Sequence, residues 1–426
     1  MAFFAQFFQH SVRVMAPRDI HQHHRASTPL ELLFDLVTVI AVAAAAGELH
    51  HAAAHGHLLQ GAGQFVLAFF AIWWAWMNYS WFASAYDNDD AVFRLLTMAV
   101  MAGSLVLAAG IKPFFQHHDL TLIVLGFVLM RLAMVLFWLR AGKHHAERRR
   151  TTRFYAVGLL LVQSYWVALW AWQPASFAAL ALLFVLGALA ELAVPALAER
   201  QGITPWHRHH MMERYGLLNL IVLGETLLAS SHAIAELHER LPQLSANLAE
   251  PAFAHAFSMA LVPLLALVLV FSLWWLYFSR EEHLQQQSYA MAFAWGYGHL
   301  LVYGAGAAVG AGVAVVVEQW LGQAHLTDQA AAAALSVPVS VYLFGLWLVR
   351  DRFIFQGLGR FVLLAFAAVT PLVTAAGVQL VSSDTQHSNP AALLTALLIT
   401  TSGCVAAVAL RSSHACCVSQ AQSAQH

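Results

Sequence analysis

Apolar stretches of about 20 residues recur along the whole chain, and only short polar connections separate them. An α-helix of this length crosses the hydrocarbon core of a bilayer. The 426 residues include 60% hydrophobic and 10% charged side chains, whereas soluble domains carry about 25% charged residues. The sequence therefore predicts an all-α integral membrane protein whose main partner is the lipid bilayer.

Twelve membrane-spanning helices are expected where apolar stretches are bounded by charge, proline or glycine. The first six lie near 30–49, 64–85, 91–111, 120–140, 154–173 and 177–198. The second six lie near 214–234, 256–278, 289–316, 332–350, 360–381 and 391–411. The stretch at 289–316 is rich in glycine, so we expect it to tilt, to break or to pack closely against its neighbours.

Basic residues are distributed unequally between the two sets of connections. With twelve spans, 18 of the 21 Lys and Arg residues fall on the side that holds both termini. Only Lys112 and Arg240 fall on the other side. Because positive residues favour the cytoplasmic side, we expect a multi-pass protein of the bacterial inner membrane with both termini cytoplasmic. The net charge of −1 argues against a nucleic-acid partner.

The two halves of the chain resemble each other, with matching residues in the same order. The matches are Thr28-Pro29 with Thr204-Pro205, Trp73-Trp74 with Trp274-Trp275, and Arg153-Phe154 with Arg360-Phe361. Six spans separate equivalent positions, so both halves insert in the same direction. The pattern predicts two parallel six-helix repeats, at 28–203 and 204–411, between a cytoplasmic segment (1–27) and a cytoplasmic tail (412–426).

Ionisable side chains inside the expected spans are the first candidates for function, because each costs about 2.5–3.5 kcal/mol to place in hydrocarbon. Asp35 lies too deep in the first span for simple helix capping, and Glu225 lies near the middle of the seventh. Arg131 in the fourth span is the expected counter-ion, and His299 in the ninth can exchange protons. Asp35, Arg131, Glu225 and His299 are thus candidates for an ion or proton pathway. A structural ion-pair network, which could include Glu191 of the sixth span, explains the same residues.

A second group of polar residues is expected at the cytoplasmic mouth. Its members are Glu31, His209, His210, Glu213 and Arg214. Glu31 shares a helix face with Asp35, and Glu213 lies within one helical turn of both histidines. Zinc sites need three or four ligands at fixed spacing. Gating or an ion-pair cluster is therefore favoured over a metal site, and we expect neither a metal nor a cofactor.

Five blocks of sequence carry a family resemblance. They are Thr28-Pro-Leu-Glu-Leu-Leu-Phe-Asp-Leu-Val, Trp73-Trp-Ala-Trp, Thr204-Pro-Trp-His, Glu213-Arg-Tyr-Gly and Leu223-Gly-Glu-Thr. In these blocks the chain resembles the bacterial low temperature requirement A (LtrA) family of multi-pass membrane proteins, over essentially the whole hydrophobic region. The resemblance implies a link to growth in the cold, and it assigns neither a substrate nor a catalytic or binding residue.

A weaker likeness is to the two-repeat potassium channels of the endolysosomal type. Those channels open each repeat with an Arg and a Phe-Ser-Asp motif, which Arg25 and Phe34-Asp35 match in part. The Ser is missing here, and Leu217 stands where the second repeat would need an Asp. The likeness is therefore one of architecture only.

Motifs of ATP-driven transport and of hydrolases are absent, since the chain has no Walker loop, no GxSxG and no HExxH. We therefore expect no catalytic residues, and a secondary transporter, linked to an ion or proton gradient, of an unidentified small solute. A cation-permeable channel with two repeats is the first alternative. A membrane enzyme or structural factor for cold adaptation is the second. The oligomeric state stays open, and a homo-oligomer is among the alternatives.

Overall fold

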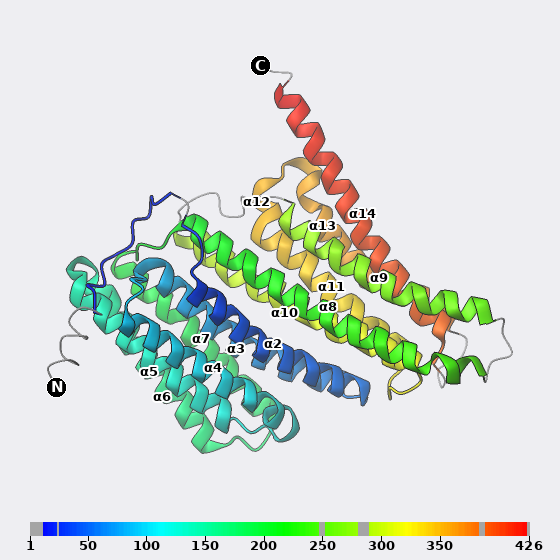
Figure 1. Cartoon of the computed structure of the whole chain (residues 1–426), viewed down its shortest axis with the longest axis horizontal. Helices are drawn as coiled ribbons and strands as arrows, with labels where there is room; N and C mark the ends of the chain where they lie inside the picture. The colour runs from blue at the N-terminus through cyan, green and yellow to red at the C-terminus, as the bar shows by residue number, and fades with distance from the viewer. Residues whose placement is uncertain (1–11, 24, 247–251, 280–288, 383–387, 424–426) are drawn as a thin grey trace. The chain divides into compact units, whose positions relative to one another are not determined.

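Every regular element in the described part of the chain is a helix. The computed structural model describes residues 12–23, 25–246, 252–279, 289–382 and 388–423 (Figure 1). The prediction of an all-α protein is confirmed for these residues. Part of the expected N-terminal segment (1–11 and 24) and the end of the expected tail (424–426) lie outside the described residues.

The helices follow the expected spans and mostly run longer. Those of the first half are α2 (Pro29–Ala54), α3 (Leu58–Tyr86), α4 (Ala91–His117), α5 (Thr121–His144), α6 (Arg149–Trp172) and α7 (Phe177–Ala198). Those of the second half are α8 (Arg208–Ala246), α9 (Ala252–Phe278), α10 (Tyr289–Trp320), α11 (Asp328–Leu346), α12 (Arg352–Ile354), α13 (Val362–Val381) and α14 (Pro390–Ser423). Short η segments are η1 (Ala146–Arg148), η2 (Glu199–Gln201), η3 (Trp347–Asp351) and η4 (Gly357–Phe361).

Eleven helices in the described residues are long and apolar enough to cross a membrane. They include α2 to α7 and α9, α10, α11, α13 and α14. The expected seventh span, 214–234, lies within α8, which is not among the eleven. A multi-pass helical membrane protein is thus confirmed, with eleven candidate spans where the sequence predicted twelve.

Polar residues at the helix starts explain where several spans begin. At the start of α2, the Thr28 hydroxyl accepts from the Glu31 N–H at 3.3 Å, and Glu31 Oε2 accepts from the Thr28 N–H at 2.9 Å. This reciprocal capping box satisfies backbone donors that an apolar solvent would leave without partners. Side chains of Asp90, Ser176 and Thr327 cap α4, α7 and α11 in the usual N-cap manner.

The chain divides into two compact units, which we describe separately. Unit 1 comprises Met1–Ala45 and Gln64–Leu217, and unit 2 comprises Ala46–Gly63 and Leu218–His426. Two boundaries fall inside helices, so α2 and α8 each contribute residues to both units. The parallel six-helix repeats, with boundaries at 28, 204 and 411, stay a prediction.

Within each unit, helices adjacent in sequence pack against each other. In unit 1, α5 packs between α4 and α6, and α7 packs on α6. In unit 2, α11 contacts α10 and α13, and α14 contacts α13 and α9 (Figure 1). The glycine-rich α10 is continuous and packs closely on α11, because a side chain at Gly312 would meet the carbonyl oxygen of Ala334. Of the three outcomes expected for the stretch 289–316, the structure shows close packing against a neighbouring helix.

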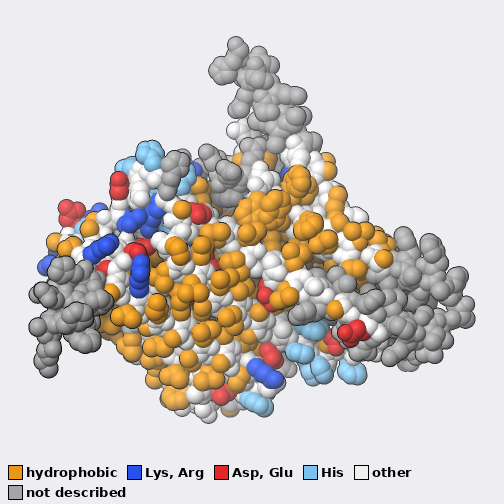
Figure 2. All heavy atoms as spheres, in the orientation of Figure 1, with side chains coloured by type: hydrophobic (Ala, Val, Ile, Leu, Met, Phe, Trp, Pro, Cys, Tyr) orange, Lys and Arg blue, Asp and Glu red, His pale blue; other side chains and the backbone are white. Residues whose placement is uncertain are grey.

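The surface of α5 shows that an apolar solvent surrounds this fold. Five leucines on one face of this helix are exposed, namely Leu125, Leu129, Leu132, Leu136 and Leu139. Their spacing of three and four residues makes a continuous stripe along the helix. Figure 2 shows apolar side chains over most of the visible described surface. In water such a stripe would be unfavourable, whereas in a bilayer it contacts lipid.

Candidate functional site

Four ionisable side chains from two distant parts of the sequence meet in unit 1. Glu31 and Asp35 lie one turn apart on α2, and His210 and Arg214 lie one turn apart near the start of α8. All four are fully buried, with 0% exposure. We call these four residues the charged ladder, because each α2 carboxylate pairs with one α8 base: Asp35 with Arg214 and Glu31 with His210.

The Asp35–Arg214 pair has bidentate geometry. Arg214 Nη2 donates to Asp35 Oδ1 at 2.7 Å, and Nη1 donates to Oδ2 at 2.8 Å. The planar guanidinium matches both carboxylate oxygens, which makes this the strongest type of charged hydrogen-bonded pair. Asp35 is therefore held in a fixed orientation, deep in a helix that is long and apolar enough to cross the membrane.

Helix α3 completes the surroundings of this pair. The Trp76 indole N–H donates to Asp35 Oδ1 at 2.7 Å, and the Ser80 hydroxyl accepts from Arg214 Nη2 at 3.2 Å. The Arg214 guanidinium also lies 5.6 Å from the centre of the Trp76 ring, within the range of a cation–π contact. Trp76 and Ser80 are four residues apart and thus share one face of α3.

The Glu31–His210 pair forms the other step of the ladder. His210 Nε2 lies 3.2 Å from each of the two Glu31 carboxylate oxygens. The same carboxylate accepts from the N–H and hydroxyl of Thr28, so it also caps α2. Glu31 therefore both caps α2 and pairs with His210. These bonds explain why its charged side chain is tolerated without contact with water.

The other two expected mouth residues lie outside the ladder. His209 and Glu213 are exposed, and Glu213 accepts a hydrogen bond from the Ser27 N–H at 3.2 Å. His210 points to the buried side of α8, so it does not share the exposed surface of Glu213. Among the residues that the structure describes, no group of three or more His, Cys, Asp or Glu is placed to hold a metal ion.

Arg131 pairs with Glu191 in a second buried cluster of unit 1. Arg131 Nη2 lies 3.0 Å from Glu191 Oε1, and both side chains are buried. The indole N–H of Trp74 donates to Glu191 Oε2 at 2.8 Å, and that of Trp166 donates to Oε1 at 3.0 Å. Helices α3, α5 and α6 thus each supply one group to the Glu191 carboxylate of α7.

A small cavity adjoins the Arg131–Glu191 cluster. Its volume is about 20 Å³, and its lining includes Glu191, Trp74, Trp166 and Phe127. A cavity of this size has room for about one water molecule. The surface that faces this cavity is apolar, formed by aromatic and aliphatic side chains beside the buried carboxylate. This cluster is therefore a compact polar centre within an aromatic shell.

Glu225 and His299 belong to unit 2. Glu225 is half-buried on α8, and His299 is fully buried on α10. The hydroxyl of Tyr277 lies 3.2 Å from His299 Nε2, and the carbonyl of Trp295 lies 2.7 Å from His299 Nδ1. Asp35 therefore lies with three of the expected mouth residues, Glu31, His210 and Arg214. Arg131 and His299 lie in two other polar clusters.

The connections beside the charged ladder carry further buried charge. Arg25 donates to the backbone carbonyls of Ala83 and Ser84 at the end of α3, and burial lowers its pKa to about 10. His207 contacts the Gln22 carbonyl through Nε2 at 2.9 Å, and burial lowers the pKa of its imidazole. These contacts fix the segment that precedes α2 against the ends of α3 and α8.

Sequence reasoning missed the role of the tryptophans. Trp74 and Trp76 belong to a run that is typical of membrane-interface belts or helix packing, yet both indoles donate to buried carboxylates. The sequence does contain a clue to this role: an indole N–H that is buried needs a hydrogen-bond acceptor, so a run of tryptophans inside a span indicates nearby acceptors. Arg350, Asp351 and Arg411, which the sequence analysis did not single out, are likewise buried in unit 2.

The charged ladder has the chemical means to bind and release a proton. Asp35 and Glu31 can each accept one, and so can the His210 imidazole, whose pKa is lowered by burial. Neutralising Asp35 would remove the attraction that holds the Arg214 guanidinium. A change of protonation therefore alters the contacts between α2 and the first turns of α8. Such coupling between charge and helix contacts is typical of ion- or proton-driven membrane proteins.

Comparison with known proteins agrees with the sequence blocks that form this site. A protein of Rhizobium meliloti (strain 1021), described as uncharacterized, is 25% identical over 299 residues, which is 66% of this chain and 66% of that protein. The chain thus aligns with just under two thirds of the relative's length. The family model described as bacterial low temperature requirement A protein (LtrA) matches residues 26–411, which include every member of the charged ladder. The chain therefore belongs to the bacterial low temperature requirement A family.

Proposed function

We propose that this protein is a secondary transporter of a small solute, linked to an ion or proton gradient, and that the charged ladder responds to the coupling ion. The supporting observation is the complete burial of Glu31, Asp35, His210 and Arg214. Ionisable residues within membrane-crossing helices are costly and are kept mainly where they bind or move ions. Their paired arrangement offers two protonation states with different helix contacts.

The proposed mechanism begins with protonation of Asp35. A neutral Asp35 no longer holds Arg214 by charge, so α8 can move relative to α2 at its first turns. Glu225 lies 11 residues beyond Arg214 on the same helix (225 − 214), which is about 16 Å along its axis. Movement of α8 would thus be transmitted to Glu225 through the helix itself. Asp35, Arg131, Glu225 and His299 remain our candidates for the pathway.

The proposal includes the cellular setting. The proposed location is the bacterial inner membrane with both termini cytoplasmic, on the basis of the excess of Lys and Arg on that side. This orientation counts α8 as a twelfth crossing, in addition to the eleven candidate spans. Two parallel six-helix repeats are part of the proposal. In this orientation the start of α2 and the start of α8 face the cytoplasm, so the charged ladder lies at the inner end of the pathway.

Proton-coupled flux into proteoliposomes tests the proposal when a mixture of small solutes is supplied outside, because a coupled transporter moves protons together with its solute. The purified full chain is reconstituted with a pH-sensitive dye inside, and a potassium diffusion potential drives protons inward. We expect Asp35→Asn and Glu225→Gln to abolish the flux while the protein still inserts. Asp89→Asn is the matched control, because Asp89 is an exposed carboxylate paired with Arg94 outside the ladder. Normal flux in both the Asp35→Asn and the Glu225→Gln variant would refute the proposal.

Planar bilayer recordings separate the transporter from a channel. A cation-permeable channel gives unitary currents at fixed voltage, whereas a transporter gives flux without resolved steps. Unitary currents that Arg214→Gln changes would replace our proposal with the channel alternative. Absence of both flux and currents, with an intact fold, would favour the enzyme or structural alternative.

A further inference from the structure

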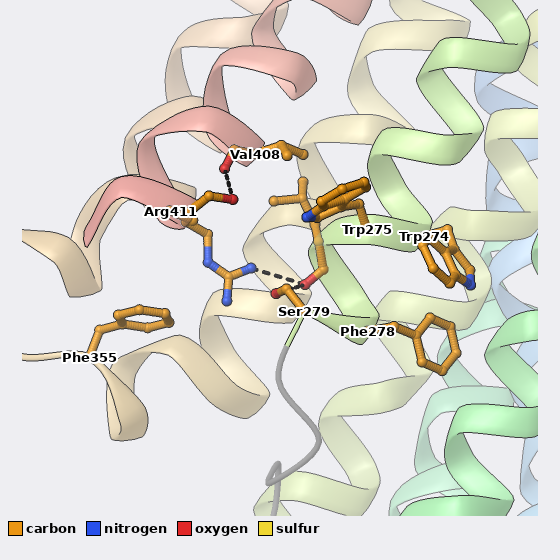
Figure 3. A pocket seen from close by; sticks show the side chains of 9 residues that line it. Trp274, Trp275, Phe278, Ser279, Phe355, Val408 and Arg411 are labelled. Carbon is orange, nitrogen blue, oxygen red and sulfur yellow. Dashed lines mark hydrogen bonds between the residues drawn. The ribbon is translucent and has the colours of Figure 1, made fainter. Parts of the chain in front are cut away.

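A cavity of about 450 Å³ lies in unit 2, where several spans end. Figure 3 shows its main walls, with Trp274, Trp275 and Phe278 on α9, Arg411 on α14, and Phe355 after α12. The candidate membrane spans Ala260–Phe278 of α9 and Pro390–Ser412 of α14 each have an end at this cavity. The cavity is therefore located at the depth where hydrocarbon gives way to lipid headgroups.

The lining has two chemically different parts. One part consists of large aromatic side chains, of which Trp274 and Trp275 are exposed to the surroundings of the helix bundle. The other part consists of the Arg411 guanidinium with the hydroxyls of Ser279 and Ser412 nearby. An apolar surface beside a cationic group matches a molecule that has an acyl chain and an anionic head.

Arg411 is held in place by its contacts and is 96% buried. Its Nη1 donates to the Leu276 carbonyl at 2.9 Å, its Nη2 lies 3.2 Å from Asp351 Oδ1, and its guanidinium lies 5.0 Å from the centre of the Phe355 ring. A guanidinium fixed in this way loses little entropy when an anion binds, which favours affinity.

The adjoining segment of the chain adds positive charge. Arg352 and Arg360 lie in the segment 350–361, whereas Arg350 is buried and paired with Asp351, the one acidic residue of the segment. Exposed apolar side chains lie between these charges, including Leu358 and Phe353. Exposed basic residues beside an anionic membrane surface strengthen lipid binding. Charge complementarity therefore favours an anionic lipid over a zwitterionic one.

We propose that the cavity bounded by Trp274, Trp275, Phe355 and Arg411 binds one anionic glycerophospholipid. Its phosphate lies near Arg411, and one acyl chain lies along the indoles of α9. Binding of this lipid does not depend on the transport function proposed above, because the site lies in unit 2 and contains none of the ladder residues.

Lipid binding to the purified full chain in detergent tests the proposal. Native mass spectrometry and thermal melting are used to compare phosphatidylglycerol with phosphatidylcholine of the same acyl chains. We expect one tightly retained phosphatidylglycerol that raises the melting temperature. Arg411→Gln should weaken it about fivefold or more, whereas Arg411→Lys should retain part of the preference. Trp275→Ala should weaken binding of both lipids.

Matched controls come from unit 1. Trp172→Ala removes an exposed indole at the end of α6, and Arg153→Gln removes an exposed basic residue at its start. Neither change should alter lipid retention. Equal affinity for the two lipids, or unchanged retention in Arg411→Gln, would overturn the proposal. Displacement of phosphatidylglycerol by millimolar inorganic phosphate alone would assign the cavity to a soluble anion. If Arg411→Gln fails to fold, Trp275→Ala and the comparison of the two lipids decide the question.

Discussion

Asp35 of α2 and Arg214 of α8 are 179 residues apart in sequence and form a bidentate ion pair that is fully buried. The desolvation cost of two such charges is large, and it is recovered only if the geometry is good and the remaining polar atoms are bonded. Here Trp76 and Ser80 supply two additional hydrogen bonds, while the buried Arg214 Nε has no hydrogen-bond acceptor among the described residues. The pair therefore contributes little net stability to the fold, which favours a functional role for it.

Removing one partner of this pair should destabilise the fold strongly. Asp35→Asn or Arg214→Gln leaves the other group buried without its counter-charge, which costs about 3–5 kcal/mol. The Asp35→Leu and Arg214→Met double variant removes both charges and should recover most of that loss. Thermal melting in detergent measures the stability of all three variants.

The same variants separate function from structure. The double variant should be stable but inactive in the proton-flux assay, since it lacks the titratable carboxylate. A stable double variant with normal flux would show that the pair is structural only. Equal destabilisation in the single and double variants would contradict our account of the burial energetics.

Trp166 should matter more to stability than its neighbour Trp170. Trp166→Phe removes a buried hydrogen bond to the charged Glu191 and should cost about 1.5–3 kcal/mol. Trp170→Phe removes a hydrogen bond to the Thr121 hydroxyl in an exposed position, so it should cost about 1 kcal/mol or less. Denaturation of the two variants, side by side, measures the difference. Equal effects would mean that Glu191 does not depend on the indole.

Gly312 and Gly47 should respond to alanine in opposite directions. A Cβ at Gly312 would collide with the backbone carbonyl of Ala334, so Gly312→Ala should force α10 and α11 apart at a cost of about 1–3 kcal/mol. A Cβ at Gly47 meets nothing within 4 Å. Gly47→Ala should therefore stabilise α2 by about 0.5–1 kcal/mol. Melting temperatures check both signs, and a loss at both positions would contradict the close contact at Gly312.

Asp87 should make stability decrease as the pH rises. It lies in the connection between α3 and α4, and burial raises its pKa from 3.8 to about 6. The folded state then binds a proton more tightly than the unfolded state, so this contribution is present below about pH 4 and is lost by about pH 6. Asp87→Asn should remove this dependence and raise the melting temperature at pH 7 but not at pH 4.

Asp90, in the same connection between α3 and α4, should make stability increase as the pH rises. Burial acts to raise its pKa, but hydrogen bonds from Arg140, the Phe93 N–H and the Arg13 N–H together lower it. Its contribution to stability is therefore present at neutral pH and is lost in acid. Asp90→Asn should lower the melting temperature at pH 7, with a smaller effect as the pH falls. The same trend in both variants would contradict the assigned environments.

Much of the fold was predictable because the bilayer imposes strict local rules. A stretch of about 20 apolar residues must be helical to satisfy its backbone in hydrocarbon, so α2 to α7 could be located by composition alone. The start of α2 was also predictable, since Thr28, Pro29 and Glu31 form a recognisable cap. The sequence blocks that resemble the LtrA family were also recognisable from the linear sequence, and the match to the family model confirms the family.

Pairing of the buried charges was not predictable from local rules. The spacing of Glu31 and Asp35 showed that they share a helix face, but no spacing relates them to His210 and Arg214. Arg131 was expected to be the counter-ion in the pathway with Glu225, whereas the structure pairs it with Glu191 of α7. The partner of a buried charge is set by which helices pack together, which is a non-local property.

The sequence by itself determined that this chain is a multi-pass helical membrane protein of the LtrA family, because hydrophobic length and motif order are properties of the linear chain. Only the tertiary structure decided that the carboxylates of α2 meet the bases of α8, that tryptophan indoles solvate Asp35 and Glu191, and that an aromatic cavity adjoins Arg411. The physical reason is that burial without water forces each charge to find its partners across helices, and helix packing alone fixes those contacts.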